Sequence, residues 1–189
     1  MMKSRFFLAV AALGISVSLQ AADSYTIDSR HLYPMFEVNH LGFSTQRGRF
    51  NKGAGKIVLD TAAKTGSVDL KIETASIDMG LDKWDEHLRG PDFFDVAKHP
   101  AITFKSTKLK FDGDKVVGAE GDLTLLGVTK PVTLAMSGFN CGDHPMLKKT
   151  VCGVDATTTI KRSDFGMKYG LPAIGDEIKL IVPVEAIKD

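Results

Sequence analysis

The chain has 189 residues, 43% of them hydrophobic and 25% charged, which is enough apolar sequence for one globular domain with its own core. Its 24 Lys and Arg residues balance 23 Asp and Glu residues, and the basic residues do not cluster. Nucleic-acid binding needs a surplus of positive charge to neutralise phosphates. The composition therefore excludes the usual nucleic-acid-binding classes.

Residues 1–22 have the pattern of a secretory signal peptide. Lys3 and Arg5 precede an uncharged run from Phe6 to Leu19, and a small-residue cleavage point follows at Ala21 and Ala22. A run of about fourteen residues is shorter than the roughly twenty that span a membrane, and every later apolar segment is interrupted by charges. We expect a signal peptide at 1–22, one domain at 23–189, no integral membrane segment, and a periplasmic or secreted location.

The rest of the chain alternates apolar and polar residues with period two, which is typical of antiparallel strands. The clearest case is 68–73, where Val68, Leu70 and Ile72 alternate with charged residues. The alternation changes phase before Leu109, which predicts a bulge near 106–108. In chain order, the pattern predicts strands around 25–27, 36–40, 43–50, 56–60, 68–72, 102–111, 118–125, 132–136, 154–160 and 178–184.

One segment, residues 81–104, breaks this alternation. Leu81, Trp84 and Leu88 are spaced for one face of a short helix, which Gly90 and Pro91 end. Phe93 and Phe94 follow at once. The residues are compatible with a plug that completes the core and with a lid that covers a ligand, and both interpretations stay open.

Consecutive hairpins without any βαβ pattern predict an all-β fold, an antiparallel up-and-down β-barrel of about eight strands with a short helical insert. Closure of the barrel removes exposed strand edges. The interior of such a barrel is either filled by side chains or holds one small ligand. The sequence does not decide between these two, and it leaves the oligomeric state open between a monomer and a dimer.

Cys141 and Cys152 form an even pair in a chain that we expect to be exported. The turn-rich segment between them would join two strands, so we predict a disulfide that staples a hairpin. A metal or haem site would require C-x-x-C or C-x-x-C-H spacing, which the sequence does not contain.

Seven short motifs follow one another along the chain. They are FEVNH at 36–40, GRF at 48–50, SID at 76–78, HLRGPDFFDV at 87–96, PAITF at 100–104, GDLTLLGVTKP at 121–131 and RSDFG at 162–166. In this order they resemble the YceI-like family of periplasmic, lipocalin-like, polyisoprenoid-binding proteins. In this sequence Trp84 stands where the family commonly has Arg, and the two cysteines lie outside the shared pattern.

The resemblance implies a lipocalin-like barrel that holds a polyisoprenoid or a similar long-chain amphiphile for sequestration or transport, without a cofactor. Arg162, in the last motif, is a candidate contact for the head group of such a ligand. The candidate pocket-lining residues come from the inward-facing positions of the strands and from the insert: Phe36, Val38, His40, Phe50, Leu70, Ile72, Trp84, Leu88, Phe93, Phe94, Phe104, Leu123, Leu134, Met136 and Ile160.

Two alternatives to a binding protein remain. The insert carries Asp82, Asp85, Glu86, Asp92 and Asp95, and carboxylates of this kind could serve a hydrolase or isomerase that acts on a lipid head group. Solvation and helix capping are the simpler interpretation of these charges, so we expect no enzyme activity. A closed barrel that works through its surface in a stress response is the other alternative.

We expect no metal site. His87, Asp92 and His99 have no spacing that is typical of metal ligands, and no H-E-x-x-H motif is present.

Overall fold

The computed structural model describes residues 22–189, so the predicted signal peptide lies outside the described residues except for Ala22. The elements, in chain order, are β1 (Asp23–Ile27), η1 (Ser29–His31), β2 (Met35–His40), β3 (Ser44–Phe50), β4 (Gly53–Asp60), β5 (Thr65–Glu73), η2 (Thr74–Ser76), β6 (Ile77–Asp78), α1 (Asp82–Arg89), β7 (Ala101–Asp112), β8 (Lys115–Leu125), β9 (Val128–Asp143), β10 (Thr150–Lys161), η3 (Arg162–Phe165) and β11 (Ile174–Lys188).

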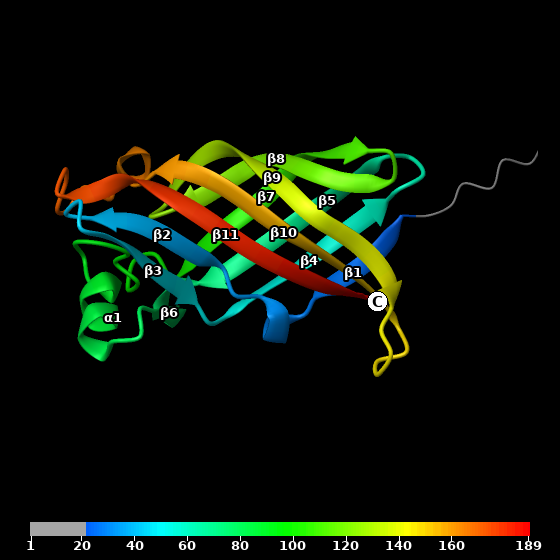
Figure 1. Ribbon diagram of the computed structural model, residues 1–189, viewed down its shortest axis with the longest axis horizontal. Helices are drawn as coiled ribbons and strands as arrows, with labels where there is room; N and C mark the ends of the chain where they lie inside the picture. Colours follow the sequence, from blue (N-terminus) through cyan, green and yellow to red (C-terminus); the bar gives the residue numbers. More distant parts are fainter. Residues whose placement is uncertain (1–21) are drawn as a thin grey trace, which may run out of the picture.

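The strands form a closed antiparallel barrel (Figure 1). Strand β1 pairs with β4 on one side and with β11 on the other. The circuit β1-β4-β5-β7-β8-β9-β10-β11 therefore returns to its first strand and closes a barrel of eight strands. This confirms the predicted all-β barrel with a short helical insert.

Strand β11 is long enough to pair with two different strands along the same edge. Its last residues pair with β1, as Ile187 does with Thr26, while its first half pairs with β2, as Leu180 does with Phe36. Strands β3 and β6 continue the sheet beyond β2. The wall of the barrel is therefore extended by the β2–β3 hairpin at the end where α1 lies (Figure 1).

Two local predictions from the sequence are confirmed. The pairing of β7 with β8 shifts register between Ser106 and Lys108, where the phase of the alternation changes. Cys141 and Cys152 lie directly opposite each other on β9 and β10 and form a disulfide across 11 residues. The hairpin that they staple lies at the opposite end of the barrel from α1, beside the C-terminus (Figure 1).

The end of the barrel with the disulfide is filled, and we call it the closed end. Buried side chains from the first strand, the last strand and the strands between them meet in the core there. They are Tyr25, Leu59, Leu109, Val116, Ala119, Cys152 and Ala186.

Within residues 22–189, no helix is both long enough and apolar enough to cross a membrane.

Candidate ligand-binding site

A cavity of about 440 Å³ lies inside the barrel. This volume is within the range of roughly 300–1,000 Å³ that is usual for small-molecule sites. Inward-facing side chains of the later strands, such as Leu134, Leu180 and Val182, are only partly buried, because they border empty space rather than one another. The barrel is therefore hollow, and the sequence left this point open.

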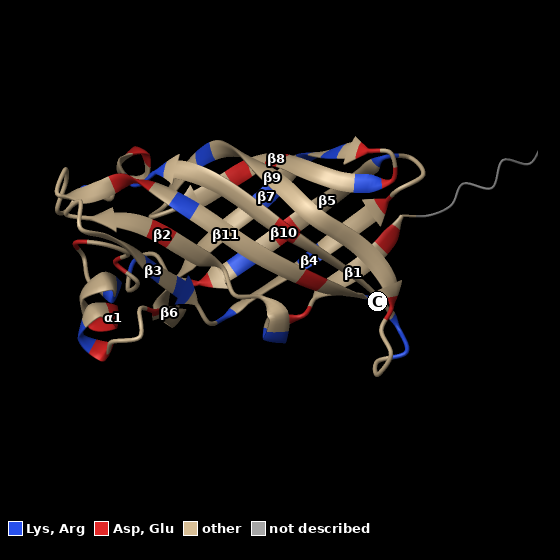
Figure 2. Cartoon of the chain, viewed as in Figure 1, with Lys and Arg blue, Asp and Glu red and all other residues tan. Residues whose placement is uncertain are grey.

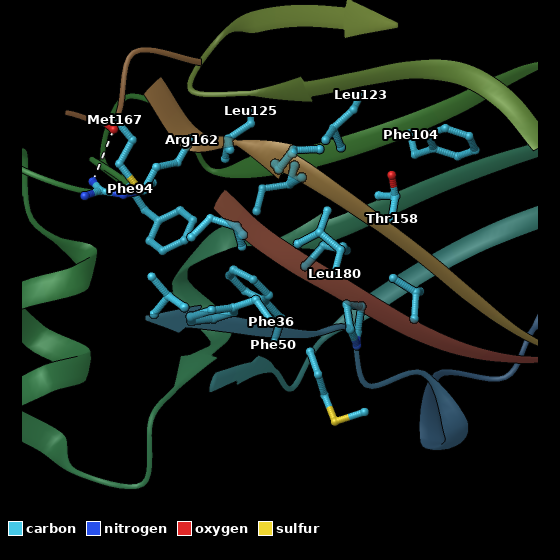
Figure 3. A pocket seen from close by; sticks show the side chains of 18 of the residues that line it. Phe36, Phe50, Phe94, Phe104, Leu123, Leu125, Thr158, Arg162, Met167 and Leu180 are labelled. Atoms are coloured by element: carbon cyan, nitrogen blue, oxygen red, sulfur yellow. Dashed lines mark hydrogen bonds between the residues drawn. The ribbon is translucent and has the colours of Figure 1, made fainter. Parts of the chain in front are cut away.

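Every pocket residue predicted from the sequence lies on the wall of this cavity, and so does Arg162. The strands place them by simple alternation, since successive side chains of a strand point to opposite faces. Figure 3 shows Phe36, Phe50 and Phe94 toward one end of the cavity, and Phe104 toward the other. Whether these residues bind a ligand stays a prediction.

Three phenylalanines from separate elements form the part of the wall next to the insert. The rings of Phe36 and Phe50 have centroids 6.1 Å apart, and Phe50 meets Phe94 edge-on at 5.5 Å. Gly48 makes room for this packing, because a Cβ atom there would collide with the Sδ atom of Met79 and the ring of Phe36. The barrel and the insert are therefore packed together along the wall of the cavity.

The helix α1 is anchored by polar contacts in addition to Leu88 of the predicted apolar stripe, which packs against the core. Asp85 is its buried residue and accepts a hydrogen bond of 2.7 Å from the backbone N–H of Met79. Arg89 donates from Nε to the carbonyl of Ala75 and from Nη2 to that of Ile77, both at 2.9 Å. Of the predicted stripe, Trp84 and Leu88 line the cavity, whereas Leu81 does not and is 50% exposed.

The cavity opens at the end that carries the insert, which we call the mouth. Apart from Met35 on β2, the exposed residues of the cavity wall are Lys83, Trp84 and His87 of the helix, and Tyr169 of the loop between η3 and β11. Phe93 and Phe94, by contrast, are buried beneath them. The helix of the insert therefore forms part of the rim of the cavity, whereas Phe93 and Phe94 form part of the inner wall of the cavity.

An aromatic cluster joins the insert to the η3–β11 loop across this mouth. The ring of His87 lies 5.1 Å from that of Phe93 and 5.6 Å from that of Tyr169. Contacts of this kind between ring edges and faces contribute roughly 0.5–1.5 kcal/mol each beyond the apolar area that they bury.

Arg162 is almost fully buried and holds the η3–β11 loop in place. Its Nε donates to the carbonyl of Gly175 at 2.8 Å, and its Nη2 to that of Ile174 at 2.9 Å. Its Nη1 donates to the carbonyls of Met167, at 3.2 Å, and Tyr169, at 2.9 Å. The bond to Met167 is drawn in Figure 3. The predicted contact of Arg162 with a head group stays a prediction, while these bonds give it a structural role at the mouth.

Burial lowers the pKa of Arg162, and the nearby carboxylate of Asp176 opposes this shift. Asp176 accepts hydrogen bonds from the backbone N–H of Ser163 at 2.9 Å and from its hydroxyl at 2.8 Å. The backbone bond is the main reason why the pKa of Asp176 lies below its ordinary value. The buried guanidinium of Arg162 is thus bound by backbone carbonyls, and Asp176 by Ser163.

The carboxylates that an enzyme could recruit lie away from the cavity. Among residues 22–189, no Asp or Glu side chain lines it. Asp85 is engaged with Met79, and Asp95 forms an ion pair with Lys98 at 2.8 Å. The described part of the chain also contains no group of three or more His, Cys, Asp or Glu residues that could hold a metal ion.

The sequence did not identify the mouth residues of the η3–β11 loop. Met167 and Tyr169 line the cavity from a segment without any periodic pattern, so alternation could not indicate their direction. Further wall residues occupy strand positions that the alternation in the sequence indicated as inward-facing, although the predicted pocket did not include them. They include Ile57, Val68, Ile102, Leu125, Val132, Val154, Ala156, Thr158, Ile178, Leu180, Val182 and Val184.

Comparison with known proteins gives consistent matches along the whole domain. The model of the YceI-like domain matches residues 25–186. The chain is 38% identical to Protein YceI of Escherichia coli O6:H1 over 191 aligned residues, which cover 100% of this chain and 99% of the relative. It is also 38% identical to a UPF0312 protein of Pseudomonas aeruginosa over 188 residues, covering 96% of this chain and 97% of the relative.

Solved structures with the same fold include a YceI protein of Campylobacter jejuni, with a TM-score of 0.67 and 30% identity, covering 80% of this chain and 90% of the other. BcnA of Burkholderia cenocepacia has a TM-score of 0.72 at 23% identity, covering 84% and 98%. A polyisoprenoid binding domain from Saccharophagus degradans, implicated in plant cell wall breakdown, has a TM-score of 0.65 at 17% identity, covering 87% and 98%. The last two similarities concern the fold alone.

Proposed function

The chain belongs to the YceI-like domain family, and we propose that it binds a polyisoprenoid or a similar long-chain amphiphile inside its barrel, for sequestration or transport. The observation that carries this proposal is the cavity of about 440 Å³, whose wall is largely apolar and open at one end. The name of the Saccharophagus degradans domain, which shares the fold, supports the same class of ligand.

The cavity suits a chain-like apolar tail better than a compact polar molecule. Each CH₂ group that leaves water for an apolar site contributes about 0.8 kcal/mol, so a long tail can bind tightly without many polar contacts. Of the polar residues on the wall, Lys83, His87 and Tyr169 are exposed at the mouth, whereas Thr103 and Thr158 lie on the barrel strands β7 and β10. We therefore place the tail in the barrel and the head group at the mouth.

Binding rather than catalysis is the activity that we propose. No carboxylate of the insert belongs to the cavity wall. The disulfide between Cys141 and Cys152 supports an oxidising compartment. We accordingly propose that residues 1–22 are removed as a signal peptide and that the domain of residues 23–189 acts in the periplasm or outside the cell.

Native mass spectrometry and lipid extraction of freshly purified protein test the proposal. We expect a bound lipid of low polarity, or uptake of an added polyprenol. The variant Ala156→Phe fills the cavity from β10 and should lose the ligand, whereas Ala135→Phe, on the outer face of the neighbouring strand β9, should retain it. A protein that is always empty and takes up no polyprenol would overturn the proposal.

A further inference from the structure

Large apolar side chains are exposed on three segments at the mouth. Phe43 and Leu41, in the turn between β2 and β3, are 88% and 49% exposed. Leu81 and Trp84, at the start of α1, are 50% and 42% exposed. Tyr169, in the η3–β11 loop, is 48% exposed. We call these five residues the apolar rim.

The three segments belong to one end of the molecule and are tied to one another. The backbone N–H of Leu41 donates to the carbonyl of Ala173 at 2.9 Å, which joins the β2–β3 turn to the η3–β11 loop. The ring contact of His87 with Tyr169 joins that loop to α1. Figure 1 shows the three segments at the same end of the barrel. The apolar rim is thus carried by three linked segments at one end of the barrel.

The apolar rim is continuous with the wall of the cavity. Trp84 and Tyr169 belong to both, since they line the cavity and are exposed on the outside. Phe43, Leu41 and Leu81 do not line it, so they contribute nothing to holding a ligand inside. Removing side chains of this kind from water is favourable, which favours an apolar partner for the apolar rim.

Charge at this end does not favour a strongly anionic or cationic partner. Lys83 lies between Asp82 and Glu86 on α1, Lys168 of the η3–β11 loop follows Asp164 of η3, and Figure 2 shows both signs of charge at the end that carries α1. Trp and Tyr side chains are favoured at the boundary between water and lipid, because each has an apolar body and a polar group.

We propose that the apolar rim docks on a phospholipid bilayer, so that a ligand tail passes between the bilayer and the cavity without crossing water. The purpose of this docking rests on the proposed function, but the docking itself requires no ligand. In this arrangement Phe43, Leu81 and Trp84 insert into the boundary between water and lipid. Tyr169 lies beside the opening of the cavity.

The test is vesicle binding by the purified protein, with Trp84 as the reporter because it is the only Trp of the chain. The vesicles contain phosphatidylethanolamine and phosphatidylglycerol without any polyprenyl lipid, and a second series carries phospholipids with brominated acyl chains. We expect cosedimentation that survives high salt, together with quenching of the Trp84 emission by the brominated lipids.

Two double variants separate the apolar rim from exposed apolar residues in general. Phe43→Ser with Leu81→Ser should weaken vesicle binding about tenfold or more, since each tenfold corresponds to about 1.4 kcal/mol. Met146→Ser with Leu147→Ser removes side chains that are 82% and 38% exposed at the closed end and should change nothing. Uptake of a polyprenol from detergent solution should be the same in both variants, because none of the four residues lines the cavity.

Three results would overturn the docking proposal: no binding and no quenching, equal loss in both double variants, or binding that high salt abolishes. A dimer in sedimentation analysis that Phe43→Ser with Leu81→Ser dissociates, without vesicle binding, would assign the apolar rim to a contact between two copies instead. Vesicle binding by a protein that never takes up a polyprenol would support docking and count against the proposed function alone.

Discussion

The ring of Phe93, in the insert, packs edge-on against the ring of Tyr169, in the η3–β11 loop, with centroids 5.2 Å apart. Phe93 is 9% exposed and Tyr169 is 48% exposed, so the contact runs from the inside of the cavity to its outer edge. The two segments that flank the mouth are therefore joined by this contact.

Tyr169→Ala is expected to speed the release of a bound polyprenol by about three- to tenfold, since an aromatic pair contributes roughly 0.5–1.5 kcal/mol. The melting temperature should change little, because the side chain is half exposed. Stopped-flow measurement of release, followed through the emission of Trp84, checks this prediction. An unchanged release rate would mean that the contact with Phe93 does not restrict exit.

Phe94→Ala serves as the contrasting variant, because Phe94 is 8% exposed and packs on Phe50 in the core. Its removal should lower the free energy of unfolding by about 3–5 kcal/mol. A loss of this size would assign Phe94 to the core as a plug, whereas faster release from Tyr169→Ala would assign a lid role to the contact between Phe93 and Tyr169. The sequence left plug and lid open, and these two variants separate them.

Gly48→Ala is predicted to destabilise the fold by about 1–3 kcal/mol, because its Cβ atom would collide with Met79 and Phe36 and force both to move. Since both of these side chains line the cavity, polyprenol uptake should fall as well. Chemical denaturation and a binding titration measure the two effects. Gly142→Ala, where the structure places no atom of residues 22–189 within 4 Å of the added Cβ, should leave both unchanged.

Reduction of the Cys141–Cys152 disulfide should lower the free energy of unfolding by about 2–3 kcal/mol in the chain-entropy model, since the closed loop is short at 11 residues. Ligand content should stay the same, because the disulfide lies at the closed end, away from the mouth. Thermal unfolding and mass spectrometry with and without reductant give the two readings. Loss of ligand on reduction would show that the closed end contributes to binding.

Stability should depend on pH through Asp28, a buried carboxylate that accepts hydrogen bonds from the side chain of Arg30 at 2.7 and 2.9 Å. These bonds hold the pKa of Asp28 well below its ordinary value of 3.8, although burial acts in the opposite direction. A carboxylate whose pKa is lower in the folded state stabilises the fold when ionised. This contribution is complete above the ordinary pKa and is lost as the pH falls toward the folded one.

The expected result is that Asp28→Asn melts at a lower temperature than the unaltered protein at pH 7, and that the difference shrinks progressively below about pH 4. Asp114→Asn, in the exposed β7–β8 turn, should melt like the unaltered protein throughout. A difference for Asp28→Asn that is constant from pH 7 to pH 3 would contradict the role of its ionised form.

Alternation in the sequence was sufficient to predict the eight barrel strands and the direction of their side chains, since burial on one face imposes a period of two. It did not predict β6, and it gave β9 and β11 shorter than they are. Leu70 and Ile72 line the cavity as that pattern requires, and the phase change near Ser106 marks a real bulge. The same reasoning could not establish that the barrel is hollow. A wall residue such as Leu134 has the same sequence pattern whether it faces another side chain or empty space.

The burial and contacts of residues near the mouth were harder to predict from the sequence. Asp85 is buried because it binds a backbone N–H six residues earlier, whereas Leu81, on the predicted apolar face, is half exposed. Arg162 has most of its guanidinium occupied by carbonyls of a loop that follows it in the chain. Such pairings depend on how the loops fold back onto these side chains, which the local periodicity of the sequence does not indicate.

The packed core of Tyr25, Leu109 and Cys152 lies behind the cavity. Under the proposed function, a ligand therefore binds with its tail toward this core and its head group at the mouth. A second protein that meets the loaded barrel at its mouth would contact the head group before the tail is released.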